Sequence, residues 1–359
     1  MRCDIAIVGA GMAGASLAAE LAPHASVVLL ETEAQPGYHA TGRSAAFWTE
    51  SYGGPLVQPL TTASGPFLRD HGLVSPRGAL TIARADDRLA LEEFAADLRR
   101  AGVRVENLSR AALLRRIPGL RQDWSWGAHE PDCSDIDVAG LHTLYLKTAR
   151  DHDAQILCRA ELERAVRTAS GWKLTLAGGR ELACDVLVDA AGAWADPVAQ
   201  LAGVRPLGMK PLRRTVAQLR TAPAPPADLP LVLDLNGAFY FKPEAGRLWL
   251  SPHDEAPSPP CDAAPEELDV ALAIDRFGGV TDWQIERVEH RWAGLRTFAP
   301  DRLPVYGFDP VCQGFFWFAG QGGFGIQTAP AAAELAAGLL LDRAIGQVDP
   351  APYLASRFR

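Results

Sequence analysis

The chain has 359 residues, of which 48% are hydrophobic and 22% are charged, and its formal net charge is −8. This length is enough for two joined domains, and the negative charge argues against nucleic acid or an anionic membrane surface as the main partner. No apolar run reaches the ~18 residues of a membrane span, a strand pattern begins too early for a signal peptide, and six scattered cysteines without a CxxC pair predict no metal site. We therefore expect a cytoplasmic protein with a small-molecule substrate.

A glycine-rich turn stands between two apolar strand patterns at the start of the chain. Ile5–Val8 leads into Gly9-Ala10-Gly11-Met12-Ala13-Gly14, a helix is predicted over Met12–Leu21, and a second strand pattern, Val27–Leu30, ends before Glu31. Such glycines let a pyrophosphate approach the helix N-terminus, and the acid takes the ribose hydroxyls. The unit predicts a site for the ADP half of a dinucleotide. The alternative is a glycine-rich turn in an ordinary α/β protein.

Helical patterns come next along the chain. A polar loop over residues 32–43 leads to an alanine-rich helix start after Ser44. Apolar residues at helical spacing then predict helices over Asp86–Ala101, Leu108–Ile117 and Ile136–Arg150, with Asp137 as an N-cap of the third.

Strand patterns dominate the second half. Strands are predicted at Gln155–Cys158, around Gly171-Trp172, at Cys184–Asp189, across Leu212–Trp249, at Trp283–Trp292 and at Gly314–Ala319. Hairpin turns are predicted at Asn236-Gly237 and Ala245-Gly246. Between and after these strands we expect a surface link at Pro257–Pro265, a helix at Val270–Phe277, and a glycine turn over 320–327 that opens a last helix, Ala329–Leu341.

The predicted fold is a mixed α/β (α+β) arrangement with a Rossmann-like domain and an interleaved antiparallel-sheet domain. Nucleotide-binding segments recur along the chain, so this domain is expected at residues 1–80, 135–205 and 290–359. A substrate domain is expected at residues 81–134 and 206–289. Two interleaved domains suit a large cofactor held between them better than they suit a dehydrogenase that uses only NAD.

Four stretches resemble the FAD-dependent D-amino acid oxidase family, which includes glycine oxidase, sarcosine oxidase and bacterial D-amino acid dehydrogenases. Within this family they are most similar to bacterial D-arginine dehydrogenase. The stretches are Glu33–Ala46, Leu201–Gly208, Trp292–Arg296 and Gln321–Thr328, and they occur in the family's order.

The resemblance implies an FAD cofactor. No cysteine stands in Arg302–Tyr306, where the sarcosine oxidases attach flavin, so we expect non-covalent FAD. The residues expected to hold it are Gly9, Gly11, Met12, Ala13, Gly14, Glu31, Thr32, Thr41, Gly42, Arg43, Ser44, Ala45, Ala46, Ala191, Gly192, Trp194, Arg296, Gly322, Gly323, Phe324, Gly325, Ile326 and Gln327.

The resemblance also implies a clamp for an amino acid carboxylate. Arginine suits this role because its fork binds a carboxylate through two hydrogen bonds. Arg214 and Arg296 are expected to form the clamp, Arg213 to point to the other face of its strand, and Tyr240 and Tyr52 to bind the substrate. Gly323 and Gln327 would lie beside it. The alternatives are surface arginines and core tyrosines, and no acid–base residue is required for hydride transfer from a neutral amine to flavin N5.

Two departures from the arginine-preferring relative predict the side chain of the substrate. Ala79 replaces a glutamate, and Phe47, followed by Trp48, replaces a histidine. An unpaired guanidinium would be costly to bury there. We expect uncharged or hydrophobic D-amino acids such as D-Phe, D-Met or D-Leu, oxidised to an imino acid that hydrolyses to a 2-oxo acid and ammonia. The alternative is that Phe47 and Trp48 are core aromatics.

Other functions stay open. The run Leu248–Leu250 lacks the lysine that sarcosine oxidases use for oxygen, which favours a dehydrogenase with a quinone acceptor over an oxidase that uses O2. Alternatives are a glycine or N-methyl amino acid oxidase, a 2-hydroxy acid dehydrogenase with His39 or His290 as its base, and a redox-inert or tRNA-associated FAD module.

Overall fold

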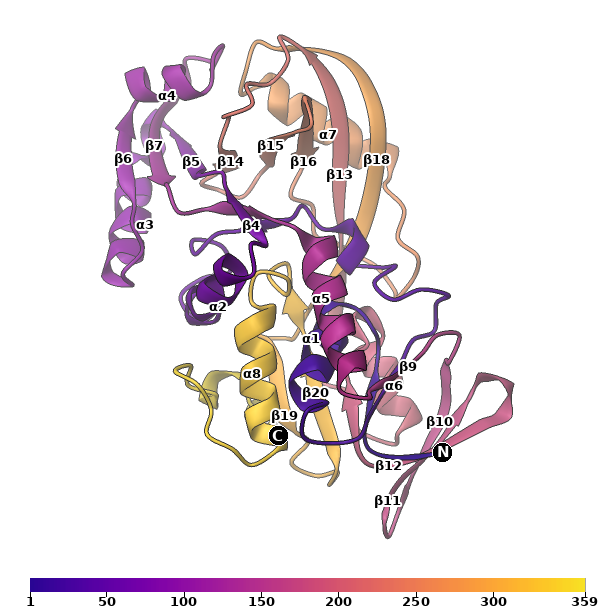
Figure 1. Cartoon of the computed structure of the whole chain (residues 1–359). Helices are drawn as coiled ribbons and strands as arrows, with labels where there is room; N and C mark the ends of the chain where they lie inside the picture. The colour runs from indigo at the N-terminus through magenta and orange to yellow at the C-terminus, as the bar shows by residue number, and fades with distance from the viewer. Residues whose placement is uncertain (359) are drawn as a thin grey trace.

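Two large sheets organise residues 1–358, the part of the chain that the computed structural model describes (Figure 1). The first has eight strands in the order β10-β11-β12-β1-β2-β9, with β20 beside β12 and β19 beside β20. Strands β2, β1, β12 and β20 run parallel to one another. The bounds are β1 Arg2–Val8, β2 Val27–Leu30, β9 Gln155–Leu157, β10 Leu162–Thr168, β11 Gly171–Leu176, β12 Arg180–Asp189, β19 Val305–Phe308 and β20 Phe315–Ala319.

Helices cover both faces of this sheet, as its continuous apolar strands require. Helix α1 packs beside α5 and α8, and α2 lies against α8 (Figure 1). Ile5 and Ile7 of β1 pack with α1, α5 and α8 in one hydrophobic cluster. Ala6 and Val8 point to the opposite face, where α6 packs. The bounds are α1 Met12–Leu21, α2 Gln58–Asp70, α5 Val138–Asp151, α6 Ala195–Leu201 and α8 Ala329–Leu340.

The second sheet has ten strands in the order β21-β18-β13-β16-β15-β14-β5-β7-β6, with β17 beside β13. The long strands β13 and β18 pair antiparallel along their whole length. The bounds are β5 Ala79–Arg84, β6 Glu106–Ser109, β7 Trp124–Glu130, β13 Lys210–Ala222, β14 Leu231–Asp234, β15 Tyr240–Glu244, β16 Arg247–Ser251, β17 Ala256–Pro257, β18 Gln284–Phe298 and β21 Gln321–Gly322.

Helix α7 covers one face of the ten-stranded sheet, and the opposite face looks toward the first sheet. Side chains alternate along β13 accordingly. Arg213 reaches Glu266 and Asp269 on the α7 side, so its neighbour Arg214 points the other way, as predicted. The bounds of the helices beside this sheet are α3 Arg88–Arg100, α4 Arg110–Arg116 and α7 Glu267–Gly278.

A third, three-stranded sheet has the order β3-β8-β4, with bounds β3 Phe47–Trp48, β4 Val74–Pro76 and β8 Ser134–Ile136. It corrects one prediction. The alanines after Ser44 do not begin a helix, because Ala46 takes a positive φ of 60° and the chain continues as β3. The prediction at Leu108–Ile117 is wrong in its first residues, since Leu108 and Ser109 pair with β7 as part of β6.

The mixed α/β fold and most predicted elements are confirmed. Asp137 caps α5 by accepting the Gly140 amide, and both predicted hairpins join neighbouring strands. Helix α2, which holds Pro66 in its interior, has no counterpart in the sequence predictions. The domain boundaries stay a prediction, although the one expected at residue 290 falls inside β18. Within residues 1–358, no helix is both long and apolar enough to span a bilayer.

Candidate functional site

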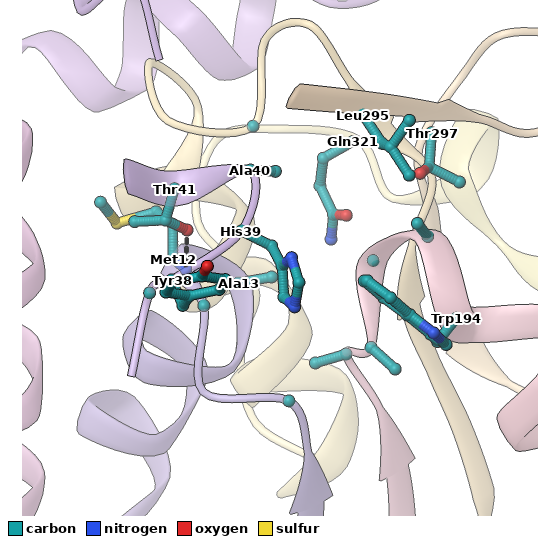
Figure 2. Close-up of a pocket in the computed structure, with 18 of the residues that line it drawn as sticks. Met12, Ala13, Tyr38, His39, Ala40, Thr41, Trp194, Leu295, Thr297 and Gln321 are labelled. Carbon is teal, nitrogen blue, oxygen red and sulfur yellow. Dashed lines mark hydrogen bonds between the residues drawn. The ribbon is translucent and has the colours of Figure 1, made fainter. Parts of the chain in front are cut away.

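A cavity of about 390 Å³ opens at the carboxyl ends of β1, β2 and β12, where the loops after these strands meet. Residues from β18 and from the turn before α8 complete its lining. Figure 2 shows Met12 and Thr41 on one side of this cavity and Trp194 and Leu295 on the other. Parallel strands that end at one edge explain why segments so distant in sequence form a single site.

The glycine turn brings backbone groups to this cavity. A Cβ on Gly14 would lie 1.8 Å from the Gly9 carbonyl oxygen, so only glycine lets α1 start this close to β1. The Met12 amide donates to Thr41 Oγ1 at 2.8 Å (Figure 2). That oxygen is also the only described atom close to where a Cβ of Gly11 would stand. The N-terminus of α1 therefore presents open backbone to the cavity, and its dipole favours a phosphate there.

Glu31 is fixed at the end of β2. One carboxylate oxygen accepts the Ala10 amide at 3.1 Å and the other accepts the Glu33 amide at 2.9 Å. These bonds hold the carboxylate in the cavity wall. A carboxylate at this point binds the two hydroxyls of a ribose and disfavours a 2′-phosphate.

A strap, residues 258–265, follows β17 of the ten-stranded sheet and contributes Cys261 and Ala263 to the lining of the cavity. Asp262 of the strap pairs with Arg43 and accepts the Tyr38 hydroxyl at 3.1 Å. Arg43 also donates to the strap backbone at 2.9 Å. The sequence predicted only a surface link here, because the partners of Asp262 lie more than two hundred residues away in the chain.

The lining of the cavity has the groups that a dinucleotide needs. It includes the glycine turn, Glu31, apolar side chains such as Leu162 and Val198, and an end formed by Arg296 and the turn 321–326. The open backbone at Gly11 stands where a pyrophosphate would lie. FAD carries the phosphates, the ribose and the flat rings that such a lining would hold.

A smaller cavity, of about 20 Å³, adjoins the large one at the end formed by Arg296. The two share Ser44, Arg296, Gly323 and Ile326. Most of the predicted substrate residues line the smaller cavity, and they come from five separate segments. They are Arg214, Arg296, Tyr240, Tyr52, Phe47, Gly323 and Gln327.

The two arginines of the small cavity differ in their partners. Arg214, 3% exposed, donates through Nε to the Asp254 carbonyl at 2.8 Å and contacts Glu255 at 3.3 Å. Arg296, 8% exposed, donates only to the Arg43 carbonyl at 3.3 Å, and no described residue forms an ion pair with it. Burial lowers the pKa of Arg296. Burial also opposes the charge of Arg214, but the nearby Tyr52 and Tyr240 hydroxyls help to raise its pKa.

Aromatic rings enclose the small cavity. Phe47 stands between Tyr52 and Tyr240, with ring centroids 5.9 and 5.8 Å away. A Cβ on Gly323 would lie 2.3 Å from the Tyr52 hydroxyl oxygen, so glycine permits this approach. The His253 ring lies next to both tyrosines. Its Nδ1 donates to the Gly237 carbonyl at 2.8 Å, because a carbonyl only accepts, so Nδ1 carries the proton.

Sequence reasoning missed His253, Glu130 and a second role of Gln327 in holding the Tyr52 segment. Burial, and then the charge of Arg214, lower the pKa of His253 to about 4. Gln327 was predicted beside the substrate, and its amide also donates to the Thr49 and Tyr52 carbonyls at 3.1 and 3.2 Å. Glu130, 3% exposed, accepts the Thr49 hydroxyl at 2.6 Å. A lone acid at the end of a strand gives no sequence signal for such a role.

Several predicted residues lie outside both cavities. Trp48 packs in the core under α2 and donates to the Thr61 carbonyl, and Ala79 lies behind Phe47. Gly14 and Gly42 support the turns rather than line the cavity, and Phe324 packs against Phe298.

The two histidines proposed as a base lie away from the arginines. His39 lines the large cavity beside Glu33, at 2.9 Å. His290 is exposed on β18, where it stacks on Trp292. Neither lines the small cavity.

Comparisons with known proteins agree with this geometry. The model of the FAD dependent oxidoreductase (DAO) family matches residues 4–339. Glycine oxidase from Geobacillus kaustophilus is 28% identical, with 99% of this chain and 97% of the relative covered, and its crystal structure superposes with a TM-score of 0.86 over 99% of both chains.

Two further relatives cover most of the chain. FAD-dependent oxidoreductase domain-containing protein 1 from Bos taurus is 24% identical over 99% of this chain and 85% of its own. The FAD-bound L-α-glycerophosphate oxidase from Mycoplasma pneumoniae has a TM-score of 0.84 at 17% identity, covering 95% of each chain.

Proposed function

Because the chain belongs to the FAD dependent oxidoreductase family and uses FAD, we propose that it oxidises the Cα–N bond of D-amino acids with uncharged side chains. The observation that carries the proposal is Arg296, a buried cation with no ion-pair partner among residues 1–358. An uncompensated buried charge is strongly unfavourable, so the site calls for an anionic ligand. With Arg214 beside it in the same small cavity, a carboxylate is the ligand of matching shape and charge.

The chain's own residues bind and orient the substrate. Arg214 and Arg296 hold its carboxylate, and the hydroxyls of Tyr52 and Tyr240 approach the same cavity. No histidine, aspartate or glutamate lines this cavity in the described chain, so the amine must arrive neutral or lose its proton to water. FAD, when bound, would accept the two electrons of the Cα–H bond that is broken.

The absence of an acid from the lining of the small cavity also supports an uncharged side chain. A D-Arg or D-Lys side chain would bring a second cation beside Arg214 and Arg296 with no described carboxylate to meet it. The repulsion between positive charges that share one poorly solvated cavity costs several kcal/mol. The resemblance to D-arginine dehydrogenase that the sequence suggested therefore does not extend, in this proposal, to its substrate.

Glycine or an N-methyl amino acid is the second candidate substrate. The small cavity, of about 20 Å³, favours it, and so does the similarity to a glycine oxidase. A 2-hydroxy acid would use the same clamp, but the position of His39 and His290 outside the small cavity removes the base that an alcohol oxidation would use.

We propose further that FAD is bound without a covalent link and that a quinone rather than O2 accepts the electrons. The six cysteines include Cys261, which lines the large cavity, so acid denaturation is the direct test of attachment. Flavin that stays on the denatured chain would rule out non-covalent binding. A comparison of turnover with a quinone and with O2 tests the acceptor.

A dye-reduction screen of the purified holoenzyme tests the substrate class. The panel contains D-, L- and N-methyl amino acids, glycine and 2-hydroxy acids. We expect reduction with glycine or uncharged D-amino acids and little with D-Arg. Reduction by 2-hydroxy acids alone would replace the proposal with the alcohol chemistry.

A further inference from the structure

Phe47 lines the small cavity together with Arg214 and Arg296. Its ring meets Tyr52 and Tyr240 edge to face, at interplanar angles of 72° and 75°. The three rings are part of the wall of this cavity, which is narrow, with a volume of about 20 Å³. A large ring in this wall leaves less space beside the two arginines than a smaller side chain would.

The Phe47 ring packs against an apolar cluster that we call the compartment. Its members are Ala45, Ala79, Cys133, Leu231, Leu233 and Tyr240, of which Ala45 and Tyr240 also line the small cavity. Ala79 and Cys133 are at most 2% exposed, and neither lines the small cavity. Burial raises the pKa of the Cys133 thiol well above its ordinary value, so the thiol is neutral. The compartment therefore carries no charge. Phe47 contacts it and also lines the small cavity with the two arginines.

The backbone that carries Phe47 is anchored. Phe47 pairs with Asp135 of β8, and Asp135 is held by Arg77 at 2.6 Å and by Lys242 at 2.7 Å. Lys242 is 1% exposed, so its charge depends on Asp135 and on Glu244 at 3.1 Å. Breaking such a buried network is costly, so the network opposes movement of the strand that carries the ring.

We propose that Phe47 sets the upper size limit of the substrate, so that the arginines accept an amino acid whose side chain is hydrogen or a methyl group. This inference rests on the proposed function for its chemistry and deepens it. The missing carboxylate excludes a cationic side chain, and Phe47 excludes a bulky one. The D-Phe, D-Met and D-Leu expected from the sequence would then be poor substrates.

Removing the ring should join the cavity to the compartment. The Phe47→Ala substitution opens a space on the order of 100 Å³ lined by apolar groups. Leu233→Ala is the matched control, because Leu233 packs in the same compartment without lining the small cavity. Phe47→Val, which places a β-branched residue suited to a strand in β3, is a second variant that should enlarge the cavity less.

The kinetic test compares kcat/KM for glycine, D-alanine and D-leucine. The wild type should prefer glycine or D-alanine. In Phe47→Ala the ratio of D-leucine to glycine should rise roughly 10- to 200-fold, the range for a gained apolar pocket, with a smaller rise in Phe47→Val and none in Leu233→Ala. A wild type that prefers D-leucine, or an unchanged ratio in both Phe47 variants, would overturn the proposal.

A binding test separates this inference from the chemistry. Acetate and 4-methylpentanoate are titrated into the holoenzyme, and the change in the visible flavin spectrum reports each Kd. The size limit predicts that acetate binds the wild type better and that Phe47→Ala reverses the order. If this reversal occurs but no amino acid is oxidised, the size limit stands and the proposed function fails. Equal selectivity in wild type and variant would refute the size limit alone.

Discussion

The two adjoining cavities are built in opposite ways. The large one depends at its expected phosphate site on backbone, from the glycine turn before α1, and the turn at 321–326 also lines it. The small one is formed by side chains, chiefly Arg214, Arg296 and a set of aromatic rings. A site made of backbone tolerates many substitutions but not an added Cβ, whereas a site made of side chains depends on individual groups. Cofactor retention and substrate oxidation should therefore respond to different mutations.

The largest effect is expected from Gly14→Val. Its Cβ would overlap the Gly9 carbonyl oxygen, so α1 must move away from β1 and the phosphate site opens. We expect the purified variant to lack FAD, as measured by the ratio of visible to ultraviolet absorbance. Gly278→Ala is the control, since a Cβ there meets open space. FAD retained in Gly14→Val would mean that the turn is not the phosphate site.

The next largest effect, on substrate oxidation, is expected from Arg296→Met. Removing a buried charge partner of the substrate costs about 2–5 kcal/mol in kcat/KM, measured per bound FAD because Arg296 also lines the large cavity. Arg220→Met, on the exposed part of β13, is the control and should leave kcat/KM unchanged. Similar losses in both variants would show that the effect of Arg296→Met is structural rather than local to the clamp.

His253, next to Tyr52 and Tyr240, should make the free energy of unfolding depend on pH. Its folded pKa, about 4, lies below the ordinary value of 6.5, so the unfolded chain takes up a proton that the folded chain does not. Stability is then constant above pH ~6.5 and falls by on the order of 1–3 kcal/mol as the pH decreases toward 4. Thermal unfolding from pH 8 to 4 measures this fall, and His253→Asn should flatten it. An unchanged slope in the variant would assign it to other groups.

The smallest effect is expected from Asp262→Ala, which releases the strap from Arg43 and Tyr38. The Asp262 side chain is 60% exposed, so the pair contributes only about 0.2–1 kcal/mol. FAD should dissociate a few-fold faster at low salt, and the difference should shrink at high salt. Identical release rates at all salt concentrations would show that the strap does not retain the cofactor.

The same contrast explains what the sequence could predict. The glycine turn, Glu31 and the strand before α8 are contiguous patterns, so the sequence could name most of the residues that line the large cavity, and their binding of the cofactor stays a prediction. The arginines and tyrosines were identified through family resemblance, and the structure brings them together in one cavity. The roles of His253, Glu130 and Asp262 depend on tertiary contacts between distant segments, which leave no local pattern.

Predictions about the side chain of the substrate fared differently. Alternation along β3 turns Trp48 into the core when Phe47 faces the cavity, so one of the two adjacent aromatics had to be structural. Ala79 lies within the compartment that Phe47 screens. Which residues a substrate side chain meets depends on the position of one ring, and composition or spacing cannot reveal that position.

Anaerobic reduction of the bound flavin tests the central claim most directly. Wild type and Arg296→Met, matched for FAD content, are mixed with glycine or D-alanine, and the loss of oxidised-flavin absorbance is followed. The account predicts rapid bleaching in the wild type and a rate at least ~30-fold lower in the variant at subsaturating substrate, the equivalent of about 2 kcal/mol. Equal rates in the two proteins would contradict the assignment of Arg296 to the substrate carboxylate.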